Sequence, residues 1–351
     1  MPAKQSDKTA MVKSERKNTA KSSSSASSTT TSTSSSPQQS AVINLLNIIS
    51  WLVLAAISSP TSQLSLSPVY GTVPAYAFHG RTLPFIAIFA FMGKHVIQRY
   101  LPSSVLSFAP VFALSIPMLQ CYLFSLSNQL GPLYGPYLTE ILTYFPLLIL
   151  SLFAAALQLD ALALSGSTSA VGTGPFAESL PVLAAYMAFS FLEKAATSLL
   201  AWLVQSHTYL VSRVGLQLAV GALYAMLKPS LYVLLAVPAL LHTFTLNPHI
   251  ITEAGNARLN ATLAAYNFSL VDRQESVTGY VSVLKNEMEQ VRVLRCDHSL
   301  LGGEWMMTPE RQKSGMTQPE PVYAVFSMLE AVRLIETGAK TPDAEKSALV
   351  M

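Results

Sequence analysis

The stretch VINLLNIISWLVLAAI, Val42–Ile57, decides the fold class of this chain. It contains no charged residue, and small residues extend the apolar run to about Ser59. A helix needs about 20 mainly apolar residues to cross the ~30 Å hydrocarbon core of a bilayer. The stretch therefore predicts a first membrane-spanning helix.

Similar apolar runs follow further along the chain, at 83–100, 105–126, 136–159, 179–205, 209–227 and 229–246. Hydrophobic residues make up 51% of the 351 residues and charged residues 12%, whereas a soluble domain is about 25% charged. These features predict a helical membrane bundle of about seven spans over residues 41–247. The run at 83–100 is the weakest candidate for a membrane span, because its second half contains Lys94, His95 and Arg99. Its alternative is a short or tilted helix whose basic end reaches the lipid headgroups.

Residues 1–40 are dominated by Lys, Ser and Thr, including the run SSSSASSTTTSTSSS at 22–36. Such a segment cannot bury enough apolar surface to offset the entropy of ordering, so it is predicted to be disordered. A signal peptide is the alternative, but the first apolar run begins late and is long enough to span a bilayer. Six basic residues within 1–21 predict a cytosolic N-terminus.

Seven crossings from a cytosolic N-terminus would place the C-terminal region outside the cell or in a lumen. The sequons at Asn260 and Asn267 are then candidate glycosylation sites. One miscounted helix reverses this side. Which membrane the bundle occupies is left open by the sequence.

Charge and cysteine usage narrow the classes of partner. The formal net charge of +3 comes from the N-terminal tail, so no basic face for nucleic acid is predicted. Cys121 and Cys296 are too few for a disulfide framework or a zinc site, and no His and carboxylate cluster has metal-ligand spacing. The predicted partner is the lipid bilayer, and no metal is expected.

Glu193 and Lys194 interrupt the apolar run at 179–205. Ionisable residues inside membrane helices are costly and often line a pathway, so these two are the support for a transport function. The alternatives are that they contact neighbouring helices, or that they separate two shorter helices. A membrane scaffold with a non-catalytic β-domain belongs to the same alternative class.

After about residue 247 the pattern changes from apolar runs to alternation. YVSVLK at 280–285 and VRVLRC at 291–296 alternate as strands do, and the intervening residues predict a turn. The glycine pair in SLLGGEW, 299–305, suits a turn or bulge before another strand. EPVYAVFSMLEAVRLIE, from Glu320, has helical periodicity, and the chain ends in the strand-like SALVM, 347–351. Residues 248–351 are thus predicted to hold a small antiparallel sheet with one helix.

Four of these segments resemble the spermidine/spermine synthase (polyamine aminopropyltransferase) family, in its membrane-spanning fungal and bacterial form. They are SVTGYVSV at 276–283, VLRCDHSLLGG at 293–303, EPVY at 320–323 and SALVM. The resemblance implies the start of a synthase-like α/β domain, aminopropyl transfer in polyamine biosynthesis, and a homo-oligomer formed through that domain. It also implies decarboxylated S-adenosylmethionine, or a related nucleoside, as the cofactor of a full-length member.

In that family a glycine-rich cofactor loop follows the SALVM strand, and here the sequence stops at Met351. The expectation is a truncated chain that binds no cofactor and is inactive alone, so its status as an enzyme is uncertain. The resemblance carries over Asp297, Glu320 and Tyr323 as candidate substrate contacts and no catalytic residue. Their alternative functions are structural. Asp297 would cap a turn, Glu320 would cap a helix, and Tyr323 would pack under the sheet.

Overall fold

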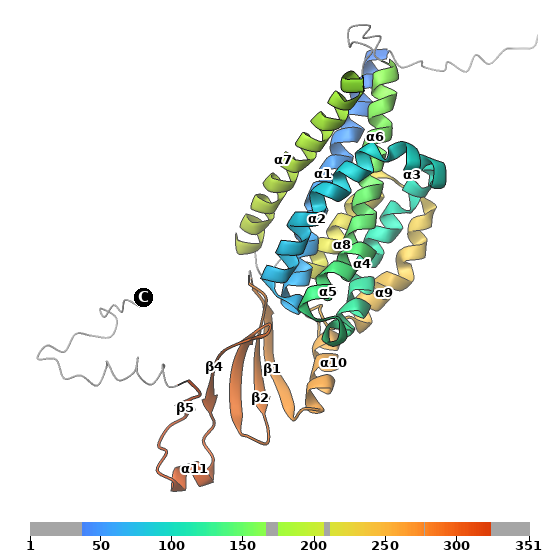
Figure 1. The fold of residues 1–351 in the computed structure, drawn as a ribbon. Coiled ribbons are helices and arrows are strands. Elements are labelled where there is room, and N and C mark those ends of the chain that lie inside the picture. Colours follow the sequence, from blue (N-terminus) through green and yellow to red (C-terminus); the bar gives the residue numbers. More distant parts are fainter. Residues whose placement is uncertain (1–36, 166–174, 207–210, 277, 324–351) are drawn as a thin grey trace, which may run out of the picture. The chain divides into compact units, whose positions relative to one another are not determined.

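A computed structural model describes residues 37–165, 175–206, 211–276 and 278–323. Within these ranges the chain forms a helical bundle followed by an antiparallel sheet (Figure 1). The helices of the bundle are α1 Pro37–Tyr70, α2 Thr72–Met92, α3 Lys94–Tyr100, η1 Ser103–Phe108, α4 Ala109–Ser125, α5 Ser127–Leu142, α6 Tyr144–Ser165, α7 Pro175–Ser206, α8 Arg213–Leu227, η2 Leu231–Ala236 and α9 Val237–Leu246. Helix α10, Glu253–Ala264, leads into the sheet.

Four stretches of helix in the described part of the chain are long and apolar enough to cross a membrane, judged by length and composition. They are Ala41–Tyr70, Ser103–Ser125, Ser127–Leu162 and Leu180–Ser206. Arg213–Leu227 and Leu231–Leu246 are shorter apolar helices. The predicted fold class, a multi-helical apolar bundle with a C-terminal antiparallel sheet, is confirmed. The prediction of about seven full spans goes further than these helix lengths support.

Two predicted spans are divided in the structure. The run at 83–100 belongs to α2 and α3, which meet at Gly93, and Lys94 Nζ contacts Asp160 Oδ1 of α6 at 2.5 Å. The run at 136–159 belongs to α5 and α6, which meet at Thr143. Of the predicted disordered tail, residues 1–36 lie outside the described residues, whereas Pro37 already begins α1.

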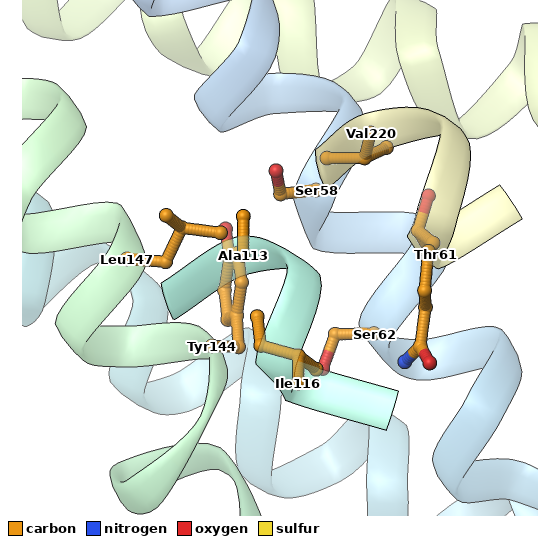
Figure 2. A pocket seen from close by; sticks show the side chains of 9 residues that line it. Ser58, Thr61, Ser62, Ala113, Ile116, Tyr144, Leu147 and Val220 are labelled. Carbon is orange, nitrogen blue, oxygen red and sulfur yellow. The ribbon is translucent and has the colours of Figure 1, made fainter. Parts of the chain in front are cut away.

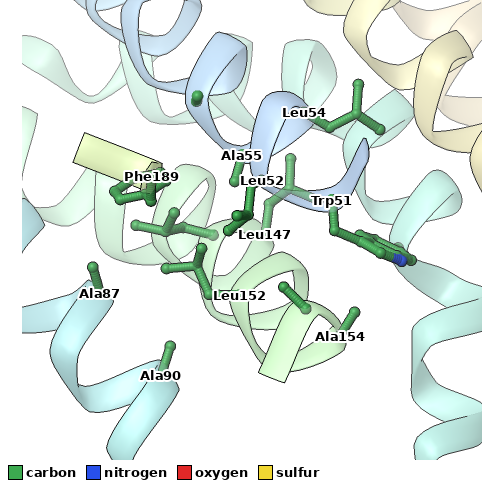
Figure 3. Packing of buried hydrophobic residues seen from close by; sticks show 14 of the residues in the cluster. Trp51, Leu52, Leu54, Ala55, Ala87, Ala90, Leu147, Leu152, Ala154 and Phe189 are labelled. Carbon is green, nitrogen blue, oxygen red and sulfur yellow. The ribbon is translucent and has the colours of Figure 1, made fainter. Parts of the chain in front are cut away.

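The centre of the bundle is built around α1, which packs against α6, α7 and α8. Trp51 and Leu52 of α1 meet Leu147 and Leu152 of α6 in one apolar cluster, and Figure 3 shows small alanines among these larger side chains. Alanine at a helix interface lets two backbones approach closely, which favours association of helices in an apolar solvent. The remaining labelled members of the cluster are Leu54, Ala55, Ala87, Ala90, Ala154 and Phe189.

The sheet is a meander in which each strand pairs antiparallel with the next, in the order β1-β2-β3-β4-β5 over the described residues. Its strands are β1 Phe268–Glu275, β2 Tyr280–Asn286, β3 Val291–Cys296, β4 Ser299–Trp305 and β5 Glu320–Pro321. The predicted hairpin is confirmed, with Asn286 opposite Val291 and Val281 opposite Cys296. The glycine pair lies inside β4 next to a bulge, because Leu294 pairs with Gly302 and Arg295 with Leu300, which leaves Leu301 of β4 as the extra residue.

The predicted helix from Glu320 does not begin there. Glu320 and Pro321 form β5 and pair with Trp305 and Glu304 of β4, so Glu320 caps no helix. A short helix, α11 Pro309–Lys313, precedes this strand. The rest of the predicted helix, and the predicted strand SALVM, lie outside the described residues.

Candidate functional site

Polar side chains from four apolar helices meet inside the bundle. Ser59 and Gln63 lie on α1, His79 on α2, Glu140 on α5 and Glu193 on α7. Ser59 and Glu140 are fully buried, and Gln63 and His79 are exposed by 2% and 4%. Because ionisable groups are expensive inside such a bundle, hydrogen-bonded clusters of this kind mark functional-site candidates. We call these five residues the polar cluster.

The polar cluster is a continuous chain of hydrogen bonds. His79 Nδ1 lies 2.6 Å from Glu140 Oε1, and His79 Nε2 lies 2.8 Å from Ser59 Oγ. Ser59 donates its hydroxyl proton to Glu193 Oε1 at 2.9 Å. Gln63 Nε2 donates to Glu140 Oε1 at 2.7 Å.

The donor directions follow from the hydroxyl of Ser59, which has only one proton. Because that proton goes to Glu193, Ser59 Oγ accepts from His79, and Nε2 of the imidazole carries a hydrogen. One further proton is shared between His79 Nδ1 and Glu140 Oε1, either as an ion pair or as two neutral groups. Both arrangements keep Nε2–H directed at Ser59.

A cavity of about 620 Å³ borders the polar cluster between α1, α2 and α7. Gln63, His79 and Glu193 lie in its lining, and aromatic and apolar side chains supply much of the rest of the wall. These are Tyr76, Leu83, Pro84, Tyr186 and Phe189. Pockets of roughly 300–1,000 Å³ with few convergent polar groups are typical of small-molecule sites.

Two polar side-chain atoms of the polar cluster are buried without a hydrogen-bond partner among the described residues. Nε2 of Gln63 is engaged by Glu140, whereas its buried Oε1 has no hydrogen-bond partner among the described residues. The other oxygen of Glu140, Oε2, is likewise buried and unpartnered in the described part of the chain.

A second cavity, of about 20 Å³, lies deeper in the bundle. Figure 2 shows side chains of α1, α4, α6 and α8 meeting around it, including Ser62 and Tyr144. The Ser62 hydroxyl is buried without a protein partner among the described residues. A volume of this size holds about one water molecule, so this cavity suits internal hydration and not a larger ligand.

A separate set of polar residues connects the bundle to the sheet. Arg213, at the start of α8, is 2% exposed, and its Nε donates to Leu64 O of α1 at 2.9 Å. Its Nη2 donates to Ser276 O at 3.0 Å, and its Nη1 lies 3.4 Å from Glu275 Oε2 of β1. We call Arg213, Glu275, Tyr280 and Arg273 the junction.

Both guanidinium groups of the junction lie near the ring of Tyr280. Arg273 is 4.3 Å and Arg213 is 5.2 Å from the centre of its ring. The Tyr280 hydroxyl donates to His249 O at 3.1 Å. Burial raises the pKa of Glu275, and burial together with the charge of Arg273 lowers the pKa of His249 to about 4. The junction thus fixes the sheet to the bundle through buried charge-assisted contacts.

Asp297 lies in the turn between β3 and β4 with φ 50°. Its Oδ1 accepts from Tyr280 N at 2.7 Å, and burial raises the pKa of its carboxyl group. The contact is sterically possible because residue 279 is glycine: a Cβ there would lie 1.8 Å from Asp297 Oδ2. The carboxylate is therefore used to close a turn, in agreement with the structural alternative for this residue.

Glu320 and Tyr323, the other two predicted substrate contacts, are both exposed. Glu320 pairs with Trp305, whereas Asp297 adjoins the opposite end of β4, about 20 Å away at ~3.3 Å per residue. The Tyr323 hydroxyl donates to Leu300 O at 3.2 Å, so this ring lies against β4. The structure does not bring Glu320 together with Asp297 into one site.

Glu193 and Lys194, the charged pair identified in the sequence, lie in different environments. Glu193 accepts from Ser59 and faces the cavity, while Lys194 has an exposed side chain at the cavity lining. Helix α7 continues through both residues, so they do not separate two shorter helices. His79 and Glu140 were missed by sequence reasoning, although each is an ionisable residue in a mainly apolar segment.

Comparison with known proteins gives one informative relative. The chain is 39% identical over 305 residues to the N-terminal histidine N-methyltransferase of Emericella nidulans. The aligned part is 86% of this chain and 53% of that protein, so the chain spans about half the length of the relative it matches. No protein-family model matches the chain, and no solved structure matches it.

This relative corrects the predicted family. Its name specifies transfer of a methyl group to nitrogen, so the predicted kinship with spermidine/spermine synthases, aminopropyl transfer and polyamine biosynthesis is wrong. The transporter and scaffold alternatives are likewise not supported by it. The substrate contacts carried over at Asp297, Glu320 and Tyr323 lose the resemblance that suggested them. Decarboxylated S-adenosylmethionine is dropped as a cofactor for the same reason.

Proposed function

We propose that this chain belongs to a membrane-embedded N-methyltransferase that acts on an N-terminal histidine of a protein substrate. The observation that carries the proposal is the 39% identity over 305 residues to a protein named for that reaction. The aligned part is 86% of the chain, so the bundle and the sheet both contribute to the match. The lipid bilayer is the proposed partner of the bundle.

The proposed methyl donor is S-adenosylmethionine. Nucleoside cofactors are commonly held where a glycine-rich loop connects a strand to a helix N-terminus in a parallel sheet. The described strands pair only antiparallel, and they are joined as a meander. The described residues therefore do not fit a donor site of that kind, and we assign no step of methyl transfer to them. They supply the membrane region and a sheet fixed to it by the junction.

The test is deletion of the gene for this chain in its source organism. Proteins whose mature N-terminus is histidine are then examined by peptide mass spectrometry for the methylated fraction. We expect methylation of N-terminal histidine to disappear and to return when the gene is restored. Proteins beginning with other residues serve as the control. An unchanged methylated fraction would refute the proposed function.

A further inference from the structure

We propose that the 620 Å³ cavity between α1, α2 and α7 binds a small organic cation, an ammonium group carried on an apolar or aromatic body. This goes beyond the proposed methyl transfer, because it concerns a site inside the bundle and does not depend on a methyl donor. The polar cluster forms one end of the cavity. The aromatic and apolar side chains form its walls.

The polar end presents acceptors. Glu193 contributes a half-buried carboxylate to the lining. An ammonium group has three donors and no acceptor, so it matches this end better than a carboxylate or phosphate does.

The hydrogen-bond chain keeps Glu193 in place. Its Oε1 accepts from Ser59 Oγ, and Ser59 in turn accepts from His79 Nε2. Thr197 Oγ1, one turn further along α7, is also within 3.4 Å of Glu193 Oε1. These contacts hold the carboxylate before a ligand arrives, which lowers the entropic cost of binding.

The walls suit the body of such a ligand. Tyr76 and Tyr186 lie in the lining, and tyrosine faces attract an adjacent cation as well as covering apolar surface. Phe189 is 1% exposed and gives the cavity a fixed apolar surface. The positive side chain in the lining, Lys194, is exposed, so its flexible stem allows the ammonium to point away from the acceptors.

The test uses three probes of similar size and different charge: 2-phenylethylammonium, 2-phenylethanol and 3-phenylpropionate. Each is titrated by calorimetry into the full chain in detergent micelles, with protein-free micelles as the reference. We expect the ammonium to bind at least ten-fold more tightly than the alcohol, because a hydrogen bond to a charged group contributes that much. Equal binding of the alcohol, or no binding of the ammonium, would overturn the proposal. Tighter binding of the anion would also overturn it, and would point to a lipid-like anionic headgroup at Lys194.

Variants locate the site. Glu193→Gln keeps the acceptor for Ser59 but removes the charge, and it should weaken binding of the ammonium about ten-fold or more. Glu253→Gln, at an exposed carboxylate on α10, is the matched control and should leave binding within about two-fold. Equal affinities for the two variants would place the ligand elsewhere and reject the assignment.

A second variant guards against misfolding. Tyr186→Leu keeps an apolar wall but removes a ring, and it should weaken the ammonium about three-fold or more while changing the alcohol less. If Glu193→Gln does not yield folded protein by thermal unfolding, Tyr186→Leu decides the outcome. Because the readout is binding by the isolated chain, its failure would leave the proposed methyl transfer unaffected.

Discussion

Replacing Arg213 by methionine should release the sheet from the bundle while leaving both folded. The side chain of Arg213 is 2% exposed and that of Glu275 is 7% exposed, so the substitution leaves a buried carboxylate without its nearest countercharge. Removing one partner of a buried ion pair costs about 3–5 kcal/mol. The backbone N–H of residue 213 still donates to Glu275 Oε2 at 2.9 Å, so we expect the lower limit of that range.

Hydrogen exchange is the suitable assay, because it reports the stability of separate regions. A loss of about 3 kcal/mol corresponds to roughly a hundred-fold faster exchange, since about 1.4 kcal/mol is ten-fold. We expect this acceleration for the amides of β1 and β2 and little change for α1 and α6. Adding Glu275→Gln to Arg213→Met should recover part of the loss, because the unpaired charge is then removed.

Arg292→Met is the matched control. Arg292 Nη1 lies 2.8 Å from Glu304 Oε1, but these side chains are 44% and 42% exposed. Exposed pairs contribute about 0–1 kcal/mol, so exchange in the sheet should change by less than about five-fold. Equal exchange in the Arg213 and Arg292 variants would refute the junction as the attachment of the sheet.

Three further predictions concern the residues around the sheet. The pKa of His249 is lowered to about 4 in the folded chain. Its contribution to the free energy of unfolding is therefore complete above the unfolded pKa near 6.5, and it is lost as pH falls from there towards 4. Thermal unfolding followed from pH 7 to 5 should therefore show a decline that His249→Gln reduces, and an identical decline in both proteins would contradict this. Gly279→Ala should cost about 1–3 kcal/mol in thermal unfolding, because the new Cβ displaces the Asp297 carboxylate from Tyr280 N; unchanged unfolding would show that the turn adapts. Asn267 is exposed in a turn with φ 61°, whereas Asn260 Oδ1 accepts from Leu270 N at 2.8 Å. We therefore expect the glycan on Asn267. A shift of the protein in gel mobility on glycosidase treatment should be lost in Asn267→Gln and kept in Asn260→Gln. Absence of any glycan would contradict the prediction that this region lies outside the cell or in a lumen.

Apolar runs in the sequence predicted the bundle well because burial and membrane insertion depend on the same side-chain property. They failed where a helix extends beyond its apolar part. Helix α2 begins at Thr72, before the predicted run, and ends at Met92 in the middle of it. Its break at Gly93 is a local backbone feature that hydropathy does not report. Alternation likewise found β2 and β3 but missed β1, Phe268–Glu275, which contains three charged residues.

The polar cluster could be predicted only in part. Glu193 is visible in the sequence as a charge in an apolar run, and Glu140 and His79 carry the same signal. Their partners are not visible, because Ser59 and Glu193 are 134 positions apart and Gln63 and Glu140 are 77 apart. Which buried charge finds which donor is decided by helix packing. The family resemblance was wrong for a related reason, since a short motif does not fix the fold around it.

A proline in α1 helps to explain why Arg213 of the junction contacts both the bundle and the sheet. Pro68 has no N–H, so Leu64 O of α1 lacks its usual intrahelical donor. A carbonyl inside an apolar bundle must find other donors, and Arg213 Nε at 2.9 Å and the Ser67 hydroxyl at 3.3 Å supply them. The same guanidinium reaches Ser276 O and Glu275 at the end of β1, so satisfying α1 also fixes the sheet. An enzyme that must present a protein N-terminus to a methyl donor beside a membrane needs such a fixed connection, and this is the role that we expect the sheet to have in the proposed methyltransferase.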